Sequence, residues 1–171
     1  GIDFDNTIAN YDCVFRKIAI KYNLISNNWH GNKQQLKKEI LRKKNIEVWK
    51  RLQGLVYGRY MYLAKVEKGV ESFLLKSKLL GTKIFIVSHK TIYGHYDKKK
   101  ILLRKAAIDW IKKKSFFKKE FINKKNIYFE SNIDNKIKCI NFLKLDFFID
   151  DLIFILSNKK FEKNTQKILY N

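Results

Sequence analysis

Short apolar runs that end in acidic or hydroxyl side chains alternate with longer amphipathic stretches along this chain. The run Ile84–Val87 leads into Ser88, and the run Phe147–Ile149 leads into Asp150 and Asp151. Brief runs of β-branched and aromatic residues beside turn residues are typical of buried strands. Because such strands alternate here with helices, we expect a parallel sheet covered by helices on both faces, which is a three-layer α/β fold.

The spacing of apolar residues predicts the individual elements of this fold. Apolar positions three and four residues apart predict helices, and short continuous apolar runs predict strands. We expect helices over 8–23, 33–67, 70–80, 100–114 and 135–145. We expect strands over 1–5, 83–87, 127–129, 147–149 and 167–170, and a loop over 26–32. The first of these strands begins abruptly, so we expect a few residues to precede it in the full-length protein.

The composition is strongly basic, which limits the possible function classes. The 171 residues carry a net charge of +21, a property of many nucleic-acid-binding proteins. However, 32 of the basic residues are Lys and only 5 are Arg, and the chain has 22 Ile and no Pro. This profile is typical of an AT-rich genome, whereas proteins that read nucleic acids favour Arg for bidentate contacts. A nucleic-acid partner is therefore possible but not favoured.

Hydropathy and cysteine content indicate the cellular compartment to expect for such a chain. The apolar runs are only about four residues long, and a membrane-spanning helix needs about 18, so we expect no membrane span. Cys13 and Cys139 lie far apart in the sequence, which disfavours both a disulfide framework and a cysteine-based zinc site. With no signal peptide visible either, we expect a cytoplasmic protein.

The segment Asp3–Thr7 carries the clearest chemical signal. Two carboxylates, Asp3 and Asp5, stand two residues apart at the end of a predicted strand. Carboxylates in such a position repel one another and lose solvation unless a cation lies between them. The alternative interpretation is an acidic loop in which Asn6 or Thr7 caps the following helix.

Further polar residues follow the other predicted strands, and ligands of parallel sheets bind beyond the carboxyl ends of their strands. Asp150 and Asp151 would supply oxygen ligands of the kind that Mg²⁺ prefers. The hydroxyl of Ser88 would suit a phosphate oxygen, although a serine there can also simply begin a turn. Lys136 starts the helix before the Asp150 strand, while its rival Lys138 would point elsewhere on that helix.

Taken in order, these motifs resemble those of the haloacid dehalogenase-like hydrolase superfamily, above all its small phosphatases. The family pattern is an Asp-x-Asp-x-Thr motif after a strand, a Ser or Thr after a strand, a Lys, and an acidic pair. The matching residues are Asp3, Asp5 and Thr7, then Ser88, then Lys136, then Asp150 and Asp151. The resemblance covers essentially the whole chain, and it implies a Rossmann-like core with a small helical cap inserted after the first strand.

The resemblance also implies a Mg²⁺-dependent phosphatase that acts through an aspartyl-phosphate. Asp3 would attack phosphorus, and Asp5 would act first as a general acid and then as a general base. The residues implied to bind the phosphoryl oxygens are Thr7, Ser88 and Lys136. The residues implied to hold the metal ion are Asp3, Asp5 through its backbone carbonyl, and Asp150 or Asp151.

The distance between the first two motifs predicts the cap. Thr7 and Ser88 are separated by 80 residues, far more than a connection between two strands needs. We therefore expect a catalytic core of residues 1–7 and 81–171, and a mostly helical insertion over 8–80 that holds the first core helix and the cap. Caps in the resembled family go with small substrates, which implies a sugar phosphate or a nucleotide. Possible substrate contacts are His30, Arg59 and His89.

Two other functions stay open at this point. An enzyme that acts on nucleic-acid ends is favoured by the charge and disfavoured by the cap. A non-catalytic basic protein that binds nucleic acid with a degenerate copy of the fold is disfavoured by the complete set of motifs. Binding to a polyanion weakens steeply as salt rises, so salt dependence distinguishes these functions from hydrolysis of a small phosphate ester.

Overall fold

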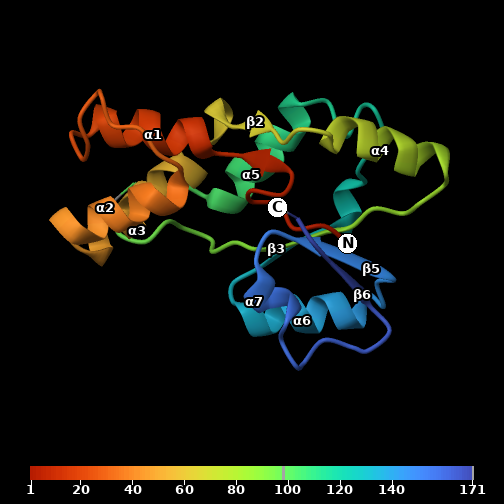
Figure 1. The fold of residues 1–171 in the computed structure, drawn as a ribbon. Coiled ribbons are helices and arrows are strands. Elements are labelled where there is room, and N and C mark those ends of the chain that lie inside the picture. The colour runs from red at the N-terminus through yellow and green to blue at the C-terminus, as the bar shows by residue number, and fades with distance from the viewer. Residues whose placement is uncertain (98, 171) are drawn as a thin grey trace. The chain divides into compact units, whose positions relative to one another are not determined.

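The computed structural model describes residues 1–97 and 99–170 and shows a mixed α/β protein (Figure 1). Within these residues it has seven α-helices and short pairs of parallel strands. The chain divides into two compact units. The sheet unit comprises Gly1–Asn10, Val66–Thr91 and the residues from Ile111 onward, and the helical unit comprises Tyr11–Lys65 and Ile92–Trp110.

The parallel strands of the sheet unit pair two by two, β3 with β4 and β5 with β6. The strands in chain order are β1 (Ala9–Asn10), β2 (Lys65–Val66), β3 (Ile86–His89), β4 (Ile127–Glu130), β5 (Phe147–Asp150) and β6 (Gln166–Leu169). Ile2 forms one parallel bridge to Ile86 and another to Ile149. In addition, the N–H of Asp3 donates to the carbonyl of Ile149 at 2.8 Å. Residues 1–3 therefore run between β3 and β5, and Asp3 lies beside the end of β5.

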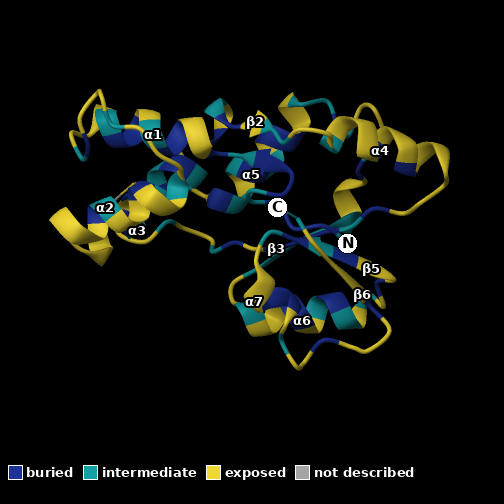
Figure 2. Cartoon of the chain, viewed as in Figure 1, coloured by how far each residue is buried: buried dark blue, intermediate teal, exposed yellow. Residues whose placement is uncertain are grey.

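The helices of the sheet unit bury apolar residues against these strands. They are α4 (Val70–Leu79), α6 (Ile133–Phe142) and α7 (Ile153–Leu156). Ile137 and Ile140 of α6 share one core cluster with Val87 of β3 and Phe148 of β5. Figure 2 shows buried and exposed residues on the same helices, as expected for amphipathic helices that cover a core.

An aromatic core holds the helical unit together. Its helices are α1 (Asp12–Lys21), α2 (Lys33–Lys43), α3 (Ile46–Tyr57) and most of α5 (Leu103–Lys113). Phe15 of α1 stacks on Trp49 of α3 with ring centroids 5.4 Å apart. The indole N–H of Trp110 donates to the carbonyl of Ala64 at 2.9 Å, which satisfies its only donor inside the core. None of the helices in the described part of the chain has the length and hydrophobicity that a membrane crossing requires.

Most predicted elements are confirmed, and the differences have local causes. The helix predicted over 8–23 begins only at Asp12, because the chain turns at Asn6 with φ of 62° and Ala9–Asn10 form β1. The helical stretch predicted over 33–67 breaks at Lys44. There the Asn45 side chain accepts a hydrogen bond from the N–H of Val48 and starts a new helix. The pattern does not predict α7, since a four-residue helix is too short to show a period.

The compact units group three segments differently from the predicted division of the chain, and the shortest of them is 8–10, which belongs to the sheet unit rather than to the insertion. The prediction places 66–80 with the insertion and 92–110 with the core, whereas the units assign 66–80 to the sheet unit and 92–110 to the helical unit. An ion pair between Lys78 and Glu120 at 2.8 Å ties α4 to the sheet unit. The Trp110 hydrogen bond ties α5 to the helical unit. Periodicity predicts that a helix has a buried face but does not predict its packing partner.

Candidate functional site

Three carboxylates meet at the carboxyl ends of the parallel strands. Asp3 ends the segment that runs between β3 and β5, Asp150 is the last residue of β5, and Asp151 follows it. One carboxylate oxygen of each residue lies within 4.8 Å of the others. Asp3 is 5% exposed and Asp150 is fully buried, while Asp151 is half-buried. The register of the strands thus brings together acids from opposite ends of the sequence.

A buried lysine bridges two of these carboxylates. The ammonium group of Lys136 donates to Asp3 Oδ1 and to Asp150 Oδ2, both at 2.6 Å. Asn132 caps α6 by accepting a hydrogen bond from a backbone N–H, and so fixes Lys136 in the first turn of the helix. Lys136 is 2% exposed, whereas Lys138 is exposed to solvent. The structure therefore brings Lys136, rather than its rival, to the acidic cluster.

Burial and mutual repulsion shape the electrostatics of this cluster. Burial raises the pKa of Asp3 from its ordinary 3.8 to about 7, with Lys136 opposing this shift and the carboxylates of Asp150 and Asp5 adding to it. Burial alone would lower the pKa of Lys136, but its contacts with Asp3 and Asp150 raise it above the ordinary value. Lys136 therefore stays charged, whereas the Asp3 carboxyl loses its proton only at a pH well above its ordinary pKa.

A second buried lysine, which the sequence analysis does not identify, contacts Asp5. The ammonium group of Lys90 donates to both carboxylate oxygens of Asp5, at 3.0 and 2.8 Å. Side chains alternate between the two sides of an extended chain, so Ser88 and Lys90 share one side and His89 takes the other. Ser88 and Lys90 are indeed buried and His89 is exposed. Ile86 and Val87 before them are both buried as well, so no periodic pattern in the sequence separates Lys90 from the other lysines of the chain.

Two hydroxyl residues complete the predicted site within the sheet unit. Thr7 follows Asp5 by two residues and is 3% exposed. Its Oγ1 is buried and has no hydrogen-bond partner among the described residues. Ser88, on β3, is 1% exposed. Since native structures rarely leave a buried hydroxyl without a partner, the Thr7 side chain is suited to receive a hydrogen bond from, or donate one to, a ligand.

The charges and donor atoms of this site fit a divalent cation. The ionisable groups are Asp3, Asp5, Asp150 and Asp151, with Lys90 and Lys136. With all of them ionised, four carboxylates and two ammonium groups leave two uncompensated negative charges. The donors available at the cluster are oxygen atoms, which Mg²⁺ prefers. A divalent cation would also oppose the burial and, to a smaller extent, the repulsion from Asp150 and Asp5 that together raise the pKa of Asp3.

Mg²⁺ is expected to raise the melting temperature more at about pH 8 than at about pH 6. The pKa of Asp3, about 7, lies above its ordinary value of 3.8, so between these values the folded chain retains a proton that the unfolded chain releases. Without metal, stability therefore falls as pH rises through this window, and a bound cation offsets the loss. Thermal unfolding with MgCl₂, or with KCl at equal ionic strength, measures the difference. Equal shifts at the two pH values would contradict this account.

The structure places the three possible substrate contacts in different surroundings. His89 lies at the end of β3, and its Nε2 is 3.1 Å from the carbonyl oxygen of Ser131. Although the residue as a whole is exposed, partial desolvation of its ring lowers the pKa of His89, so the ring is neutral near pH 7. His30 and Arg59 belong to the helical unit, where the Arg59 guanidinium lies 5.8 Å from the ring centroid of Tyr60. The sheet unit thus contains His89 but neither of the other two residues.

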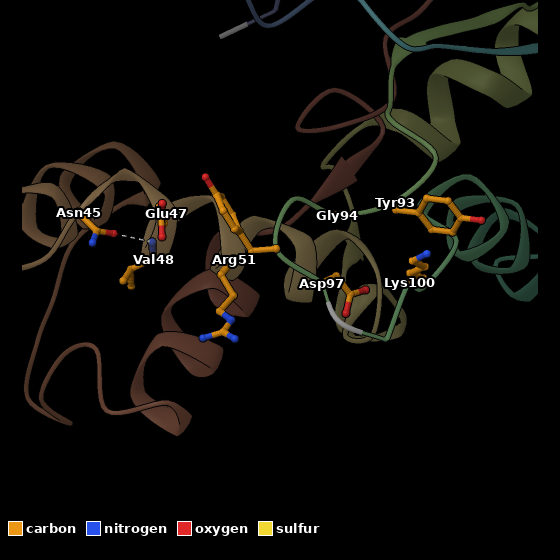
Figure 3. Close-up of a pocket in the computed structure, with 9 residues that line it drawn as sticks. Asn45, Glu47, Val48, Arg51, Tyr93, Gly94, Asp97 and Lys100 are labelled. Carbon is orange, nitrogen blue, oxygen red and sulfur yellow. Dashed lines mark hydrogen bonds between the residues drawn. The ribbon is translucent and has the colours of Figure 1, made fainter.

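The helical unit contains pockets of its own. One of them has a volume of about 590 Å³, and Figure 3 shows that α3 and the loop after residue 92 line it. Its polar lining residues include Asn45, Glu47, Arg51, Asp97 and Lys100. A second pocket, of about 350 Å³, is lined by Arg59 together with Arg51. Of the candidate site residues, only Arg59 lines either pocket.

No model of a known protein family matches the chain, and a search of curated proteins finds no significant match.

Proposed function

We propose that this chain is a Mg²⁺-dependent phosphatase of a small phosphorylated metabolite, and a divergent member of the haloacid dehalogenase-like superfamily with a three-layer core. The observation that carries the proposal is the buried cluster in which Lys136 bridges Asp3 and Asp150. Burial of several carboxylates is costly, and groups with strongly perturbed pKa values concentrate at functional sites. The order of the motifs along the chain supports the family assignment.

In the proposed reaction Asp3 is the nucleophile and Asp5 transfers protons. An oxygen of Asp3 attacks phosphorus, and the bond to the ester oxygen breaks as protonated Asp5 gives its proton to that oxygen. An alcohol leaves, and an aspartyl-phosphate remains on Asp3. Water then attacks phosphorus while Asp5 accepts its proton, which releases inorganic phosphate and restores both carboxyl groups. Lys136 orients Asp3 and offsets the repulsion between its carboxylate and the phosphate.

The acidic cluster would hold the metal ion. Asp3, Asp150 and Asp151 are the residues whose oxygens lie close enough together to share one cation. When bound, Mg²⁺ neutralises negative charge on the transferred phosphoryl group. The Asp150 carboxylate is already oriented, because its Oδ1 accepts a hydrogen bond from the N–H of Leu152 at 2.9 Å.

The hydroxyls of Thr7 and Ser88 would bind phosphoryl oxygens, and Thr7 offers a clean test. Thr7→Val removes a buried hydroxyl that has no partner in residues 1–97 and 99–170, so the variant is expected to be at least as stable as the wild type. Its phosphatase activity should fall about 10-fold or more, since one hydrogen bond to the phosphoryl group is lost. Urea unfolding and steady-state hydrolysis of an aryl phosphate measure the two effects. A loss of stability of more than about 1 kcal/mol would show that the hydroxyl has a structural partner.

Hydrolysis of 4-nitrophenyl phosphate with and without Mg²⁺ tests the proposed function directly. Turnover that requires Mg²⁺ is expected, and a panel of sugar phosphates and nucleotides would then identify the substrate class. We attribute substrate choice to the helical unit, because specificity in the resembled family goes with the cap. Failure of the folded protein to bind Mg²⁺, or the absence of turnover on every phosphate ester tested, would overturn the proposal.

A further inference from the structure

Lys90 is a buried lysine that the proposed reaction does not use. Its side chain is 1% exposed, compared with 16% for that of its partner Asp5. Both oxygens of Asp5 accept hydrogen bonds from its ammonium group, at 3.0 and 2.8 Å. This contact is separate from the bridge that Lys136 makes between Asp3 and Asp150. The two lysines therefore serve different carboxylates.

The surrounding structure fixes the position of Lys90. Its backbone N–H donates to the carbonyl of Glu130 at 2.8 Å, which extends the β3–β4 pairing by one residue. Its ammonium group lies 5.5 Å from the ring centroid of Phe4, within the range of a cation–π contact. Phe4 is fully buried and directly precedes Asp5. Backbone, ring and carboxylate thus all hold the lysine at one end of β3.

Stability alone is a poor explanation for this pair. Taking an ammonium group out of water costs several kcal/mol, and a buried ion pair often gives no more stability than apolar residues of the same size. By contrast, Lys160 and Asp134 form an ion pair at 2.7 Å in the same unit with both side chains more than half exposed. Contact with both oxygens does what an apolar residue cannot do, because it holds the Asp5 carboxylate facing the Lys90 ammonium group.

We propose that Lys90 is a positioning residue that orients the Asp5 carboxylate for proton transfer. This inference rests on the proposed function and deepens it. In the structure Lys90 contacts the proton-transferring residue, whereas Lys136 contacts the nucleophile. Loss of Lys90 therefore reduces kcat and leaves KM nearly unchanged. The loss in kcat is largest for substrates with poor leaving groups, because their leaving oxygen depends most on receiving a proton.

The test compares Lys90→Met with the matched control Lys160→Met, which breaks the exposed ion pair. On phenyl phosphate, which has a poor leaving group, Lys90→Met is expected to lower kcat about 10- to 100-fold with KM changed less than about 3-fold. On 4-nitrophenyl phosphate, which has a better leaving group, the loss in kcat is expected to be several-fold smaller. Lys160→Met is expected to behave as the wild type on both esters.

A double-variant cycle shows whether Lys90 acts through Asp5. In an Asp5→Asn background, adding Lys90→Met is expected to change kcat less than about 2-fold, because the residue that Lys90 orients is already gone. Unfolding curves confirm that each variant is folded, and Lys90→Gln replaces Lys90→Met if the latter does not fold. Gln keeps a hydrogen-bond donor but has neither the charge nor the reach of Lys.

The possible outcomes separate this inference from the proposed function. Wild-type turnover together with a loss in kcat/KM that is equal on both esters, or a full additional loss in the Asp5→Asn background, overturns the role of Lys90 and leaves the phosphatase proposal intact. Wild-type protein that hydrolyses neither ester in the presence of Mg²⁺ overturns both. A large loss on phenyl phosphate that disappears in the Asp5→Asn background supports both.

Discussion

Asp3→Asn is expected to abolish Mg²⁺-dependent phosphate ester hydrolysis, with kcat at least about 10⁴-fold lower than that of the wild type. An amide oxygen carries no negative charge and cannot form the aspartyl-phosphate. The substitution is nearly isosteric, and it removes a buried carboxylate whose pKa is already raised to about 7 by burial and by the acids around it. The variant should therefore fold, and its melting temperature should stay close to or above that of the wild type.

The matched control for this experiment is Asp134→Asn. Asp134 is an exposed acid of the same unit that pairs with Lys160, so its loss tests the effect of removing one carboxylate that does not belong to the acidic cluster. Its activity is expected to equal that of the wild type. If Asp3→Asn retains hydrolysis above one tenth of the wild-type rate, Asp3 is not the nucleophile. The phosphatase activity would then have to come from another group.

Lys136→Met is expected to cost about 3–5 kcal/mol of unfolding free energy at neutral pH. The lysine side chain is 2% exposed and holds two carboxylates that are 7% and 0% exposed. Its removal leaves Asp3 and Asp150 buried side by side without a cation. Methionine is similar in size to lysine, so the packing is kept and the lost charge dominates the change in unfolding free energy. Urea unfolding of Lys136→Met beside Lys160→Met, which breaks a solvent-exposed ion pair, isolates this cost.

Added Mg²⁺ and a second substitution are each expected to restore part of the stability that Lys136→Met loses. Mg²⁺ should recover part of it, because a divalent cation replaces the missing positive charge between the acids. Adding Asp3→Asn should recover part of it as well, because one of the two carboxylates is then neutral. A loss of less than about 1 kcal/mol for the single variant would mean that solvent reaches these carboxylates when the lysine is gone.

The sequence predicts a site residue when its place in a predicted helix or strand marks it out. It does not predict a residue whose role depends on a contact with a residue far away in the sequence. Lys136 is predictable among 32 lysines because it stands in the first turn of the helix that precedes Asp150. Lys90 is equally buried, but its role depends on the neighbouring Asp5, which lies 85 positions away. No periodic pattern of apolar residues around Lys90 indicates this contact, because buried residues follow one another from Ile86 to Ser88.

The division of the chain into units is also only partly visible in the sequence. The helical periodicity of 100–114 is clear, and α5 forms there over Leu103–Lys113. Nothing in that periodicity indicates that the indole of Trp110 donates to Ala64 and so joins α5 to the helical unit. The sequence also does not predict where α1 begins, for a related reason. A single left-handed residue, Asn6, redirects a chain whose apolar spacing continues undisturbed.

The central place of residues 1–3 in the sheet has a consequence for how the protein is made. Ile2 bridges to Ile86 and to Ile149, so this segment finds its second neighbour only after the chain has been synthesised up to Ile149. Until then one side of it presents unpaired backbone groups, which is the condition under which nascent chains aggregate or bind chaperones. Contacts between residues so far apart in sequence also form slowly. The carboxylate cluster that joins Asp3 to Asp150 is therefore among the last parts of the sheet unit to assemble.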